Sequence, residues 1–287
     1  MSGGGMTFGT RADQRRSRFL TYTGLILLAA LFVAPVAWNF LYSLKSAAES
    51  ASINVHLLPQ HAQWGTYKQA LTLIDFWQYL WNTLLIAVPY ATLITITSAL
   101  VGFGFARLRA CGRSGLFVLM LATSMVPQIL TVIPTYVLFT RIHLVNTRWP
   151  WVLWGLAASP FLAFLFRQFF ASLPAELEDA AILDGCGWLR IFARIFLPLS
   201  KPVLATSFIL SFTWVWGDFF TPEIFLNNDK TTLAVAMGNG YTDPVTDTPL
   251  SNVLAAGTMF YVLPVLIVFF LAQRSFVRGV ATTGLKG

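Results

Sequence analysis

The chain has 287 residues, of which 56% are hydrophobic and only 11% are charged. Soluble globular domains carry about 25% charged residues, so this composition excludes an ordinary soluble domain and indicates a membrane protein. The formal net charge of +7 could suggest nucleic-acid binding in a soluble protein, but here the basic residues flank long apolar segments, as membrane orientation signals do.

Six apolar segments are long enough to cross a bilayer as helices, since about 20 residues span roughly 30 Å of hydrocarbon. The first is too long for the apolar core of a cleaved signal peptide, so we expect it to remain as a membrane helix. The second and third contain no charged residue, and none of the six alternates in hydropathy as a barrel strand does. The sequence therefore predicts an all-α membrane protein. Within a transmembrane domain over 20–272, the predicted spans are 20–42, 82–105, 115–139, 149–166, 203–226 and 253–272.

The basic residues are divided unequally between the two sides of the membrane. Fourteen of the 19 Lys and Arg residues lie on the side that holds both termini, and five lie on the other side. Loops rich in Lys and Arg stay in the cytosol, so both termini are predicted to be cytosolic. The predicted cytosolic segments are an N-terminal tail over 1–19, a long loop over 167–201 and a C-terminal tail over 273–287.

The long cytosolic loop contains the stretch EDAAILDGCGWLRIFARIFLP, residues 178–198. Its first half predicts a short helix, because acidic residues favour the first turn of a helix and glycine ends one. Leu177, Ala180 and Ala181 are spaced to share one face. Residues 188–197 predict an amphipathic helix with basic residues opposite an apolar stripe. A short acidic helix on an anchored base suits docking to a cytosolic partner, and a solvated loop helix without a partner is the alternative.

In this stretch Asp179-Ala180-Ala181 is followed by Gly185, then Ile195, then Leu197-Pro198. This spacing resembles the EAA signature of permease subunits of bacterial ABC importers, with Asp179 in place of the usual Glu. Other matching segments extend the likeness over nearly the whole chain and resemble the sugar-permease branch of the maltose and glycerol-phosphate type. They are Asn82-Thr83, FARLRACGR, RQFFASLPAELEDAAILDG, WVWGDFF and the closing GLKG.

The resemblance implies six transmembrane helices, with a cytosolic coupling helix between the fourth and the fifth, in an inner-membrane protein surrounded by lipid. The chain would pair with a second permease subunit to carry a sugar or related polyol by alternating access. Two cytosolic ATP-binding subunits would hold ATP and Mg, and an extracytoplasmic solute-binding protein would deliver the solute. The chain itself would be non-catalytic, without a cofactor and without a nucleic-acid partner.

The same resemblance assigns residues to these contacts. The loop 174–198 would couple the chain to the ATPases, with Asp179 meeting a basic residue, Ala180 and Ala181 lining a groove, and Gly185 making the turn. The outer loop 228–250 would probe the binding protein. The predicted coupling residues are Glu178, Asp179, Ala180, Ala181, Asp184 and Gly185, and the predicted tail contacts with the ATPases are Gly284, Leu285 and Lys286.

Asp218, in the fifth predicted span, is the leading candidate for contact with the solute. An acidic residue near the membrane is costly and often functional. Trp214 and Trp216 flank it, and aromatic faces beside a hydrogen-bonding acid suit a sugar. Asn82 and Gln128 are further candidates. The alternative is that the Trp residues belong to the interfacial aromatic belt and that the polar groups pack between helices.

Two other classes of membrane protein are weighed against the importer subunit. A stand-alone secondary carrier needs coupling-ion sites near the midplane, and the charge-free second and third spans argue against it. A membrane enzyme needs convergent His, Cys, Ser or carboxylate groups at membrane depth, and the sequence offers no such set. The G-x-x-x-x-G-K-[ST] phosphate loop is also missing, which excludes the chain as the ATP-hydrolysing motor. No metal site is predicted, because the three His lack further ligands at suitable spacing.

Overall fold

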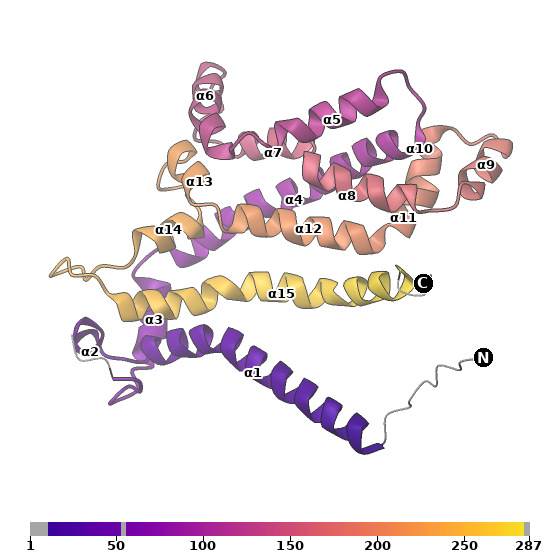
Figure 1. Ribbon diagram of the computed structural model, residues 1–287. Coiled ribbons are helices and arrows are strands. Elements are labelled where there is room, and N and C mark those ends of the chain that lie inside the picture. Colours follow the sequence, from indigo (N-terminus) through magenta and orange to yellow (C-terminus); the bar gives the residue numbers. More distant parts are fainter. Residues whose placement is uncertain (1–10, 53–55, 284–287) are drawn as a thin grey trace. The chain divides into compact units, whose positions relative to one another are not determined.

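The structure, a computed structural model, describes residues 11–52 and 56–283. Regular elements in these residues are all helices, apart from an isolated bridge between Thr242 and Pro249, so the predicted all-α class is confirmed. In chain order (Figure 1) they are α1 (Arg11–Ser43), α2 (Ala47–Ala51), α3 (Gly65–Thr72), α4 (Phe76–Arg107), α5 (Arg113–Thr123), α6 (Gln128–Arg141), α7 (Trp149–Leu156), α8 (Pro160–Ala171), α9 (Glu176–Leu183), α10 (Trp188–Ile191), the π-helix η1 (Phe192–Phe196), α11 (Leu197–Leu199), α12 (Lys201–Trp216), α13 (Phe220–Phe225), α14 (Leu233–Asn239) and α15 (Ser251–Thr283).

Four stretches of the described chain are long and apolar enough to cross a membrane as helices, and up to six are if each of two bent pairs counts as one span. The first bent pair is α5 with α6, at 92°, and the second joins the segment 188–199 to α12 at 82°. The upper limit of this range equals the six predicted segments, and the range fits a multi-pass membrane protein. The four are Arg18–Ser43, Phe76–Arg107, Trp149–Ala171 and Ser251–Leu271.

The structure corrects the prediction of continuous third and fifth spans. Residues 115–139 divide into α5 and α6 at Pro127, which has no N–H to continue the helical hydrogen bonding. Residues 203–226 divide into α12 and α13 after Gly217. Helix α1 begins at Arg11 within the predicted tail, while the apolar candidate span begins at Arg18, close to the predicted residue 20. Hydropathy reports the environment of a segment but is insensitive to a change in helix direction.

The described residues form two compact units. The first contains the described parts of Met1–Ala70 together with Tyr241–Met259. In it the Tyr241 hydroxyl donates to the Ala70 carbonyl at 2.8 Å, and Asn252 Nδ2 donates to the Lys45 carbonyl at 3.0 Å. Burial raises the pKa of the Tyr241 phenol, so this donor stays protonated well above neutral pH. The side chains of Tyr241 and Asn252 therefore fix the positions of α3 and of the residues that follow α1.

The second unit contains the described parts of Leu71–Gly240 and Phe260–Gly287 and is built along α4, against which α7, α8 and α12 pack (Figure 1). α4 and α8 approach each other closely at Gly102, where a Cβ atom would lie 2.5 Å from the Phe166 Cβ on α8. Small residues allow such close packing between membrane helices. Two apolar clusters flank this contact. One contains Phe76, Ile86, Trp151, Phe212 and Phe225, and the other contains Phe103, Phe166, Phe170, Phe192 and Phe196.

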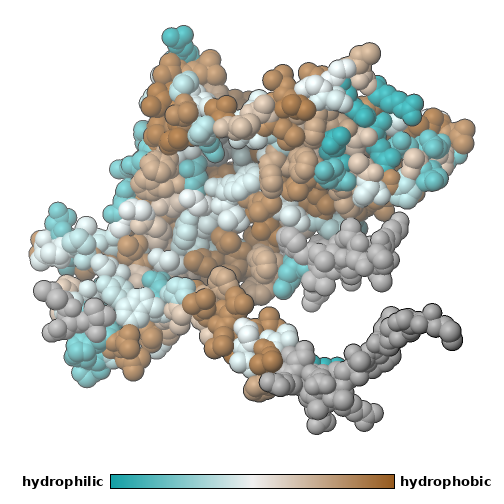
Figure 2. Space-filling model, viewed as in Figure 1, coloured by the Kyte–Doolittle hydropathy of each residue, from teal (hydrophilic) through white to brown (hydrophobic). Residues whose placement is uncertain are grey.

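Surface hydropathy also differs along the second unit. Figure 2 shows hydrophobic residues over α5 and α6 and hydrophilic residues gathered around α9. Val118 and Leu119 on α5 and Ile133 on α6 are exposed by 64–70%. An apolar surface of this kind is suited to contact with lipid or with another membrane subunit, and α9 is suited to water.

Candidate functional site

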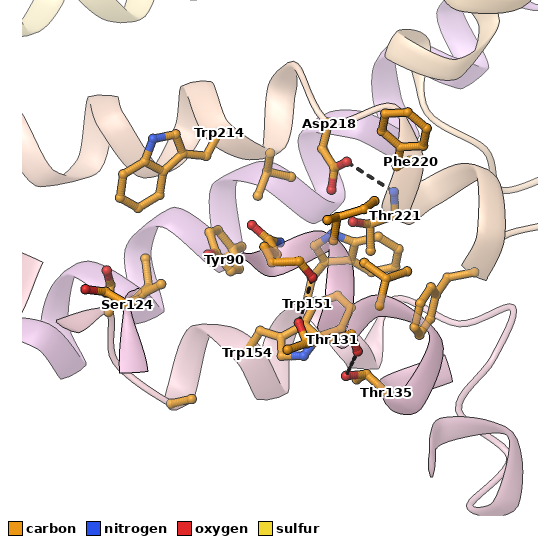
Figure 3. Close-up of a pocket in the computed structure, with 18 of the residues that line it drawn as sticks. Tyr90, Ser124, Thr131, Thr135, Trp151, Trp154, Trp214, Asp218, Phe220 and Thr221 are labelled. Atoms are coloured by element: carbon orange, nitrogen blue, oxygen red, sulfur yellow. Dashed lines mark hydrogen bonds between the residues drawn. The ribbon is translucent and has the colours of Figure 1, made fainter. Parts of the chain in front are cut away.

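A cavity of about 810 Å³ lies in the second unit where three interrupted helices meet. Its lining draws on the α5–α6 break, the α7–α8 break and the α12–α13 break (Figure 3). Interrupted backbone at membrane depth is tolerated where it lines a cavity, because lipid cannot pair with free N–H and C=O groups. The three breaks contribute Ser124 and Gln128, Ser159 and Pro160, and Asp218 and Phe220, respectively.

The break between α7 and α8 is held by two hydroxyl groups of α4. Thr97 Oγ1 donates to the Gly155 carbonyl at 2.9 Å, and Ser98 Oγ accepts the N–H of Ser159 at 2.8 Å. Between these positions Ala158 has φ 57°, a left-handed conformation that is uncommon for a residue with a Cβ atom. Polar side chains of a neighbouring helix thus replace the hydrogen bonds that the interrupted helix loses.

Asp218 brings a carboxylate to the cavity wall. It follows the end of α12, and its Oδ1 accepts the N–H of Thr221 at 3.1 Å (Figure 3). Among the described residues that line the cavity, Asp218 is the only charged one. Tyr90, Trp154 and Trp214 contribute aromatic surface to the same cavity. Aromatic faces, hydroxyl groups and one acceptor for hydrogen bonds make the cavity suitable for a polar, uncharged molecule.

Three of the five predicted solute contacts, Gln128, Trp214 and Asp218, line this cavity. Trp216 does not, because it points into the protein core and only 2% of its surface is exposed. Its indole Nε1 donates to the carbonyl of Tyr261 at 3.2 Å, and the Tyr261 hydroxyl donates to the Trp216 carbonyl at 2.7 Å. Trp214 and Trp216 lie close to Asp218 in sequence, but successive residues of a helix point about 100° apart, so the two indoles face different surroundings.

Asn82 is also placed away from the cavity. Its amide Nδ2 donates to the carbonyls of Asp229 and Thr231, both at 3.2 Å, and its Oδ1 accepts from Arg148 Nη2 at 2.8 Å. Asn82 thus ties the start of α4 to two loops, and this buried side chain has a structural explanation. Asn82 is not among the described residues that line the cavity, and its contact with solute stays a prediction.

Sequence reasoning did not identify the α7–α8 break as part of the site. Its signal is the pair Ser159-Pro160 inside the fourth apolar segment, because Ser is a favoured N-cap and Pro a favoured first helical residue. In the structure Ser159 caps α8 with its hydroxyl group, which accepts the N–H of Leu162. Tyr90 and Trp154 offered no comparable signal, since aromatic residues are frequent in membrane spans.

The second candidate site is α9 and the turn that follows it. The N–H of Gly185 donates to the Ile182 carbonyl, and the N–H of Cys186 donates to the Ala181 carbonyl, both at 2.9 Å. This pair of bonds is the Schellman motif, which places its glycine in the left-handed region, and Gly185 has φ 78°. The predicted turn at Gly185 is present and ends α9 sharply.

One face of α9 is turned toward its own subunit. Ala181 is buried in the apolar cluster that contains Phe103 and Phe170. The Glu178 side chain is only 15% exposed, and its Oε2 lies 3.5 Å from Nη1 of Arg107 in an ion pair. Glu178 and Ala181 therefore make intramolecular contacts.

The opposite face of α9 is open. Asp179, Ala180 and Asp184 are exposed, and Leu183 has 89% of its surface exposed. Ala180 is exposed whereas Ala181 is buried, so the two alanines predicted to line a groove together are not both on the free surface. The exposed surface of α9 combines acidic groups with three large apolar side chains, those of Leu177, Ile182 and Leu183.

The segment that follows α9 matches the predicted amphipathic pattern. Ile191, Phe192 and Phe196 are buried, while Arg190 and Arg194 are exposed. The apolar stripe packs on protein, with the Phe103 and Phe196 ring centroids 5.0 Å apart. The packing of this segment on Phe103 fixes the chain after α9 to the last part of α4.

Two predictions remain, the C-terminal tail contacts and the absence of a metal site. Gly284, Leu285 and Lys286 lie outside the described residues. Within the described part of the chain, no three His, Cys, Asp or Glu side chains gather in a way that could hold a metal ion.

A match to known sequences shows what kind of protein has this arrangement. Residues 98–282 match the family described as the binding-protein-dependent transport system inner membrane component. The chain belongs to this family. The matched range includes α9 and the residues of all three helix breaks that line the cavity.

Curated relatives match this transport component over nearly its full length. It is 29% identical to the probable ABC transporter permease protein YurM of Bacillus subtilis, over 95% of this chain and 91% of that protein. It is 30% identical to the diacetylchitobiose uptake system permease protein NgcG of Streptomyces coelicolor, over 92% and 87%. It is also 30% identical to the maltodextrin transport system permease protein MdxG of Bacillus subtilis, over 94% and 97%.

A solved structure has the same fold. It is the crystal structure of a bacterial ABC transporter involved in the import of the acidic polysaccharide alginate. One of its chains aligns with a TM-score of 0.74 and 25% identity, covering 94% of this chain and 100% of that chain. The fold of this transport component is therefore shared with an ABC import system.

Proposed function

We propose that this chain is the permease subunit of an ATP-driven ABC importer and that, with a second permease subunit, it forms the pathway for a neutral sugar. The observation that carries the proposal is the cavity at the meeting point of three interrupted helices, in a chain of this family. The relatives' names support a saccharide, since they include permeases for diacetylchitobiose, arabinooligosaccharides, lactose and maltodextrin.

The charge of the cavity favours a neutral sugar over an anionic one. Asp218 is the charged residue of the described lining, and no basic side chain balances it there. In a partly desolvated site a carboxylate repels uronates and sugar phosphates more strongly than it would in water. Sugar hydroxyls can donate to Asp218, and the apolar face of a sugar ring can pack on Trp154 or Trp214. A related neutral polyol has the same chemistry.

We assign α9 as the coupling helix, in the cytosol with both termini of the chain. The unequal distribution of Lys and Arg supports this orientation. The exposed face with Asp179, Ala180 and Leu183 would enter a groove of the ATP-binding subunit, where a basic residue would meet Asp179. ATP and Mg would bind to the partner subunits, and this chain would be non-catalytic.

The loop from Tyr241 to Leu250 is the proposed contact with an extracytoplasmic solute-binding protein. Asp243 Oδ1 accepts the N–H groups of Val245 at 2.8 Å and Thr246 at 3.0 Å, which lowers the pKa of Asp243. The Val245 side chain at the tip is 92% exposed. A loop already ordered by its own hydrogen bonds would lose little conformational entropy when a partner binds. The tail contact through Gly284, Leu285 and Lys286 stays a prediction.

The assignment of α9 can be tested by charge reversal at Asp179. The variant Asp179→Lys should still insert and purify with the second permease, but it should lose the ATP-binding subunit in affinity purification. Asp229→Lys is the matched control, because Asp229 is an exposed acid that would lie on the opposite side of the membrane. Full recovery of the ATP-binding subunit with Asp179→Lys would contradict the coupling assignment.

A further inference from the structure

Arg107, the last residue of α4, contacts three other elements through one guanidinium group. Its Nη2 donates to the carbonyl of Phe170 in the last turn of α8 at 2.6 Å and to that of Leu173, just after α8, at 2.5 Å. Its Nη1 lies 3.5 Å from Glu178 Oε2 on α9, and its Cζ lies 5.0 Å from the centroid of the Phe196 ring in η1. Arg107 thus joins α4, α8, α9 and η1.

These contacts are buried and use the geometry of arginine. The Arg107 side chain is 8% exposed and the Glu178 side chain 15% exposed. The last carbonyls of α8 have no partner within the helix, and a cation stabilises a helix at this end. A planar guanidinium can donate to these carbonyls and pair with a carboxylate at the same time, because its N–H groups point in several directions in one plane. The single ammonium group of lysine cannot reproduce this arrangement. The site therefore requires arginine, and any displacement of α9 acts on Arg107 through Glu178.

α4 and α8 are joined closely enough to move together. At Gly102 a Cβ atom would lie 2.9 Å from the Ala163 carbonyl and closer still to Phe166, so the two backbones touch. Farther along, Ser98 accepts the N–H of Ser159 at the start of α8. Packed interiors deform little, so a force applied at one end of such a pair is transmitted to the other.

The other end of this helix pair lies at the cavity. Tyr90 and Ile94 of α4 line it, as do Ser159 and Pro160 at the start of α8. The pair therefore connects the α9 contact at Arg107 with the wall proposed to bind sugar.

We propose that Arg107 is a positioning residue that transmits the movement of α9 to the cavity through the α4–α8 pair, with Glu178 as its partner on α9. This role rests on the proposed function, because α9 must be the element that the ATP-binding subunits move. The proposal also gives different roles to the two neighbouring acidic residues of α9. Glu178 connects the helix to its own subunit, and Asp179 faces the ATPase.

The test measures how strongly nucleotide binding changes the cavity. A reporter cysteine at Thr131 in the cavity wall, in a background lacking Cys111 and Cys186, is labelled with a membrane-impermeant maleimide. Labelling rates of the assembled transporter in liposomes are compared with and without a non-hydrolysable ATP analogue. The same comparison is made with Glu178→Gln, Arg107→Lys and their double variant. Arg109→Lys is the control, because Arg109 is exposed two residues farther along.

We expect Glu178→Gln and Arg107→Lys to retain the ATP-binding subunits while the nucleotide-induced change in labelling falls by about threefold or more. The double variant should be no worse than Arg107→Lys alone, because both changes break one connection. Arg109→Lys should behave as the parent. A purely structural contact would reduce the yield of complex but not the response of each assembled complex.

An unchanged nucleotide response in Glu178→Gln would overturn the proposal. If Arg107→Lys fails to assemble, the result for Glu178→Gln is sufficient to test the proposal. Strict additivity of the two changes would also overturn it. Failure of the parent chain to recruit ATP-binding subunits would instead contradict the proposed function.

Discussion

Asp218 combines two tasks that a single substitution can separate. Its carboxylate is the charge on the described cavity wall, and it also accepts the N–H of Thr221 at the start of α13. Asp218→Asn keeps an acceptor for Thr221 and removes only the charge. A hydrogen bond to a charged group contributes about 1.5–3 kcal/mol, so we expect uptake to fall about tenfold or more with unchanged assembly.

This prediction is checked by uptake of a panel of labelled neutral oligosaccharides into cells. Glu223→Gln, which neutralises an exposed acid five residues later, is the control and should transport normally. Equal uptake by Asp218→Asn and the parent chain would leave Asp218 with its structural task alone.

Tyr241 provides a test of stability in the first unit. Tyr241→Phe leaves the Ala70 carbonyl without its donor, which should lower the free energy of unfolding by about 1–3 kcal/mol. Burial raises the pKa of Tyr241, so its contribution is complete below pH 10 and is lost as pH rises through the range in which the unfolded phenol ionises.

Both the loss of stability in Tyr241→Phe and its dependence on pH can be measured by thermal unfolding in detergent between pH 7 and pH 11. The difference in stability between the parent and Tyr241→Phe should be largest at neutral pH and shrink above about pH 10. A difference that grows with pH would show that the phenol is not buried as described.

At the scale of elements, the end of α9 depends on backbone conformation and not on space. A Cβ atom at Gly185 or at Gly187 would meet nothing within 4 Å, but Gly185 has φ 78° and Gly187 has φ −75°. Gly185→Ala should therefore cost about 1–2 kcal/mol and loosen the last turn of α9, while Gly187→Ala should be tolerated. Hydrogen exchange of the α9 amides measures the difference. Equal protection in both variants would argue against the Schellman turn.

The α4–α8 contact depends on space and not on conformation. Gly102→Ala would place a Cβ atom 2.5 Å from that of Phe166, whereas Gly104→Ala would meet only Leu108 Cδ1 at 4.0 Å. We expect the first to destabilise the subunit by about 1–3 kcal/mol through overpacking. The second should be neutral or slightly stabilising, because Ala is the better helix former. Thermal midpoints of the two purified variants check this contrast, and equal midpoints would contradict the close approach.

Element by element, the sequence predicted what hydropathy and capping residues determine. The all-α class, the amphipathic segment after Trp188 and the turn at Gly185 follow from local chemistry. The breaks at Pro127, Ser159 and Gly217 were not predicted, because hydropathy is the same for an interrupted span and a continuous one, and only Ser159-Pro160 offers a capping signal. Sequence spacing also could not separate Trp214 from Trp216, or Glu178 from Asp179, because their directions depend on what each helix packs against.

At the scale of the molecule, the second unit connects two candidate sites through its longest buried helix. The cavity receives Tyr90 from α4, and the α9 face is held by Arg107 at the end of that helix. In the proposed function ATP would be consumed on partner subunits and only movement would reach the solute, so such a connection would be required.

The most direct measurement is affinity purification of this chain from its native membrane, followed by mass spectrometry and an ATPase assay of the recovered material. Our account predicts recovery of a second permease subunit and an ATP-binding subunit, with ATP hydrolysis by the complex. Recovery of the chain alone, with solute transport in liposomes driven by an ion gradient, would contradict the account and indicate a secondary carrier.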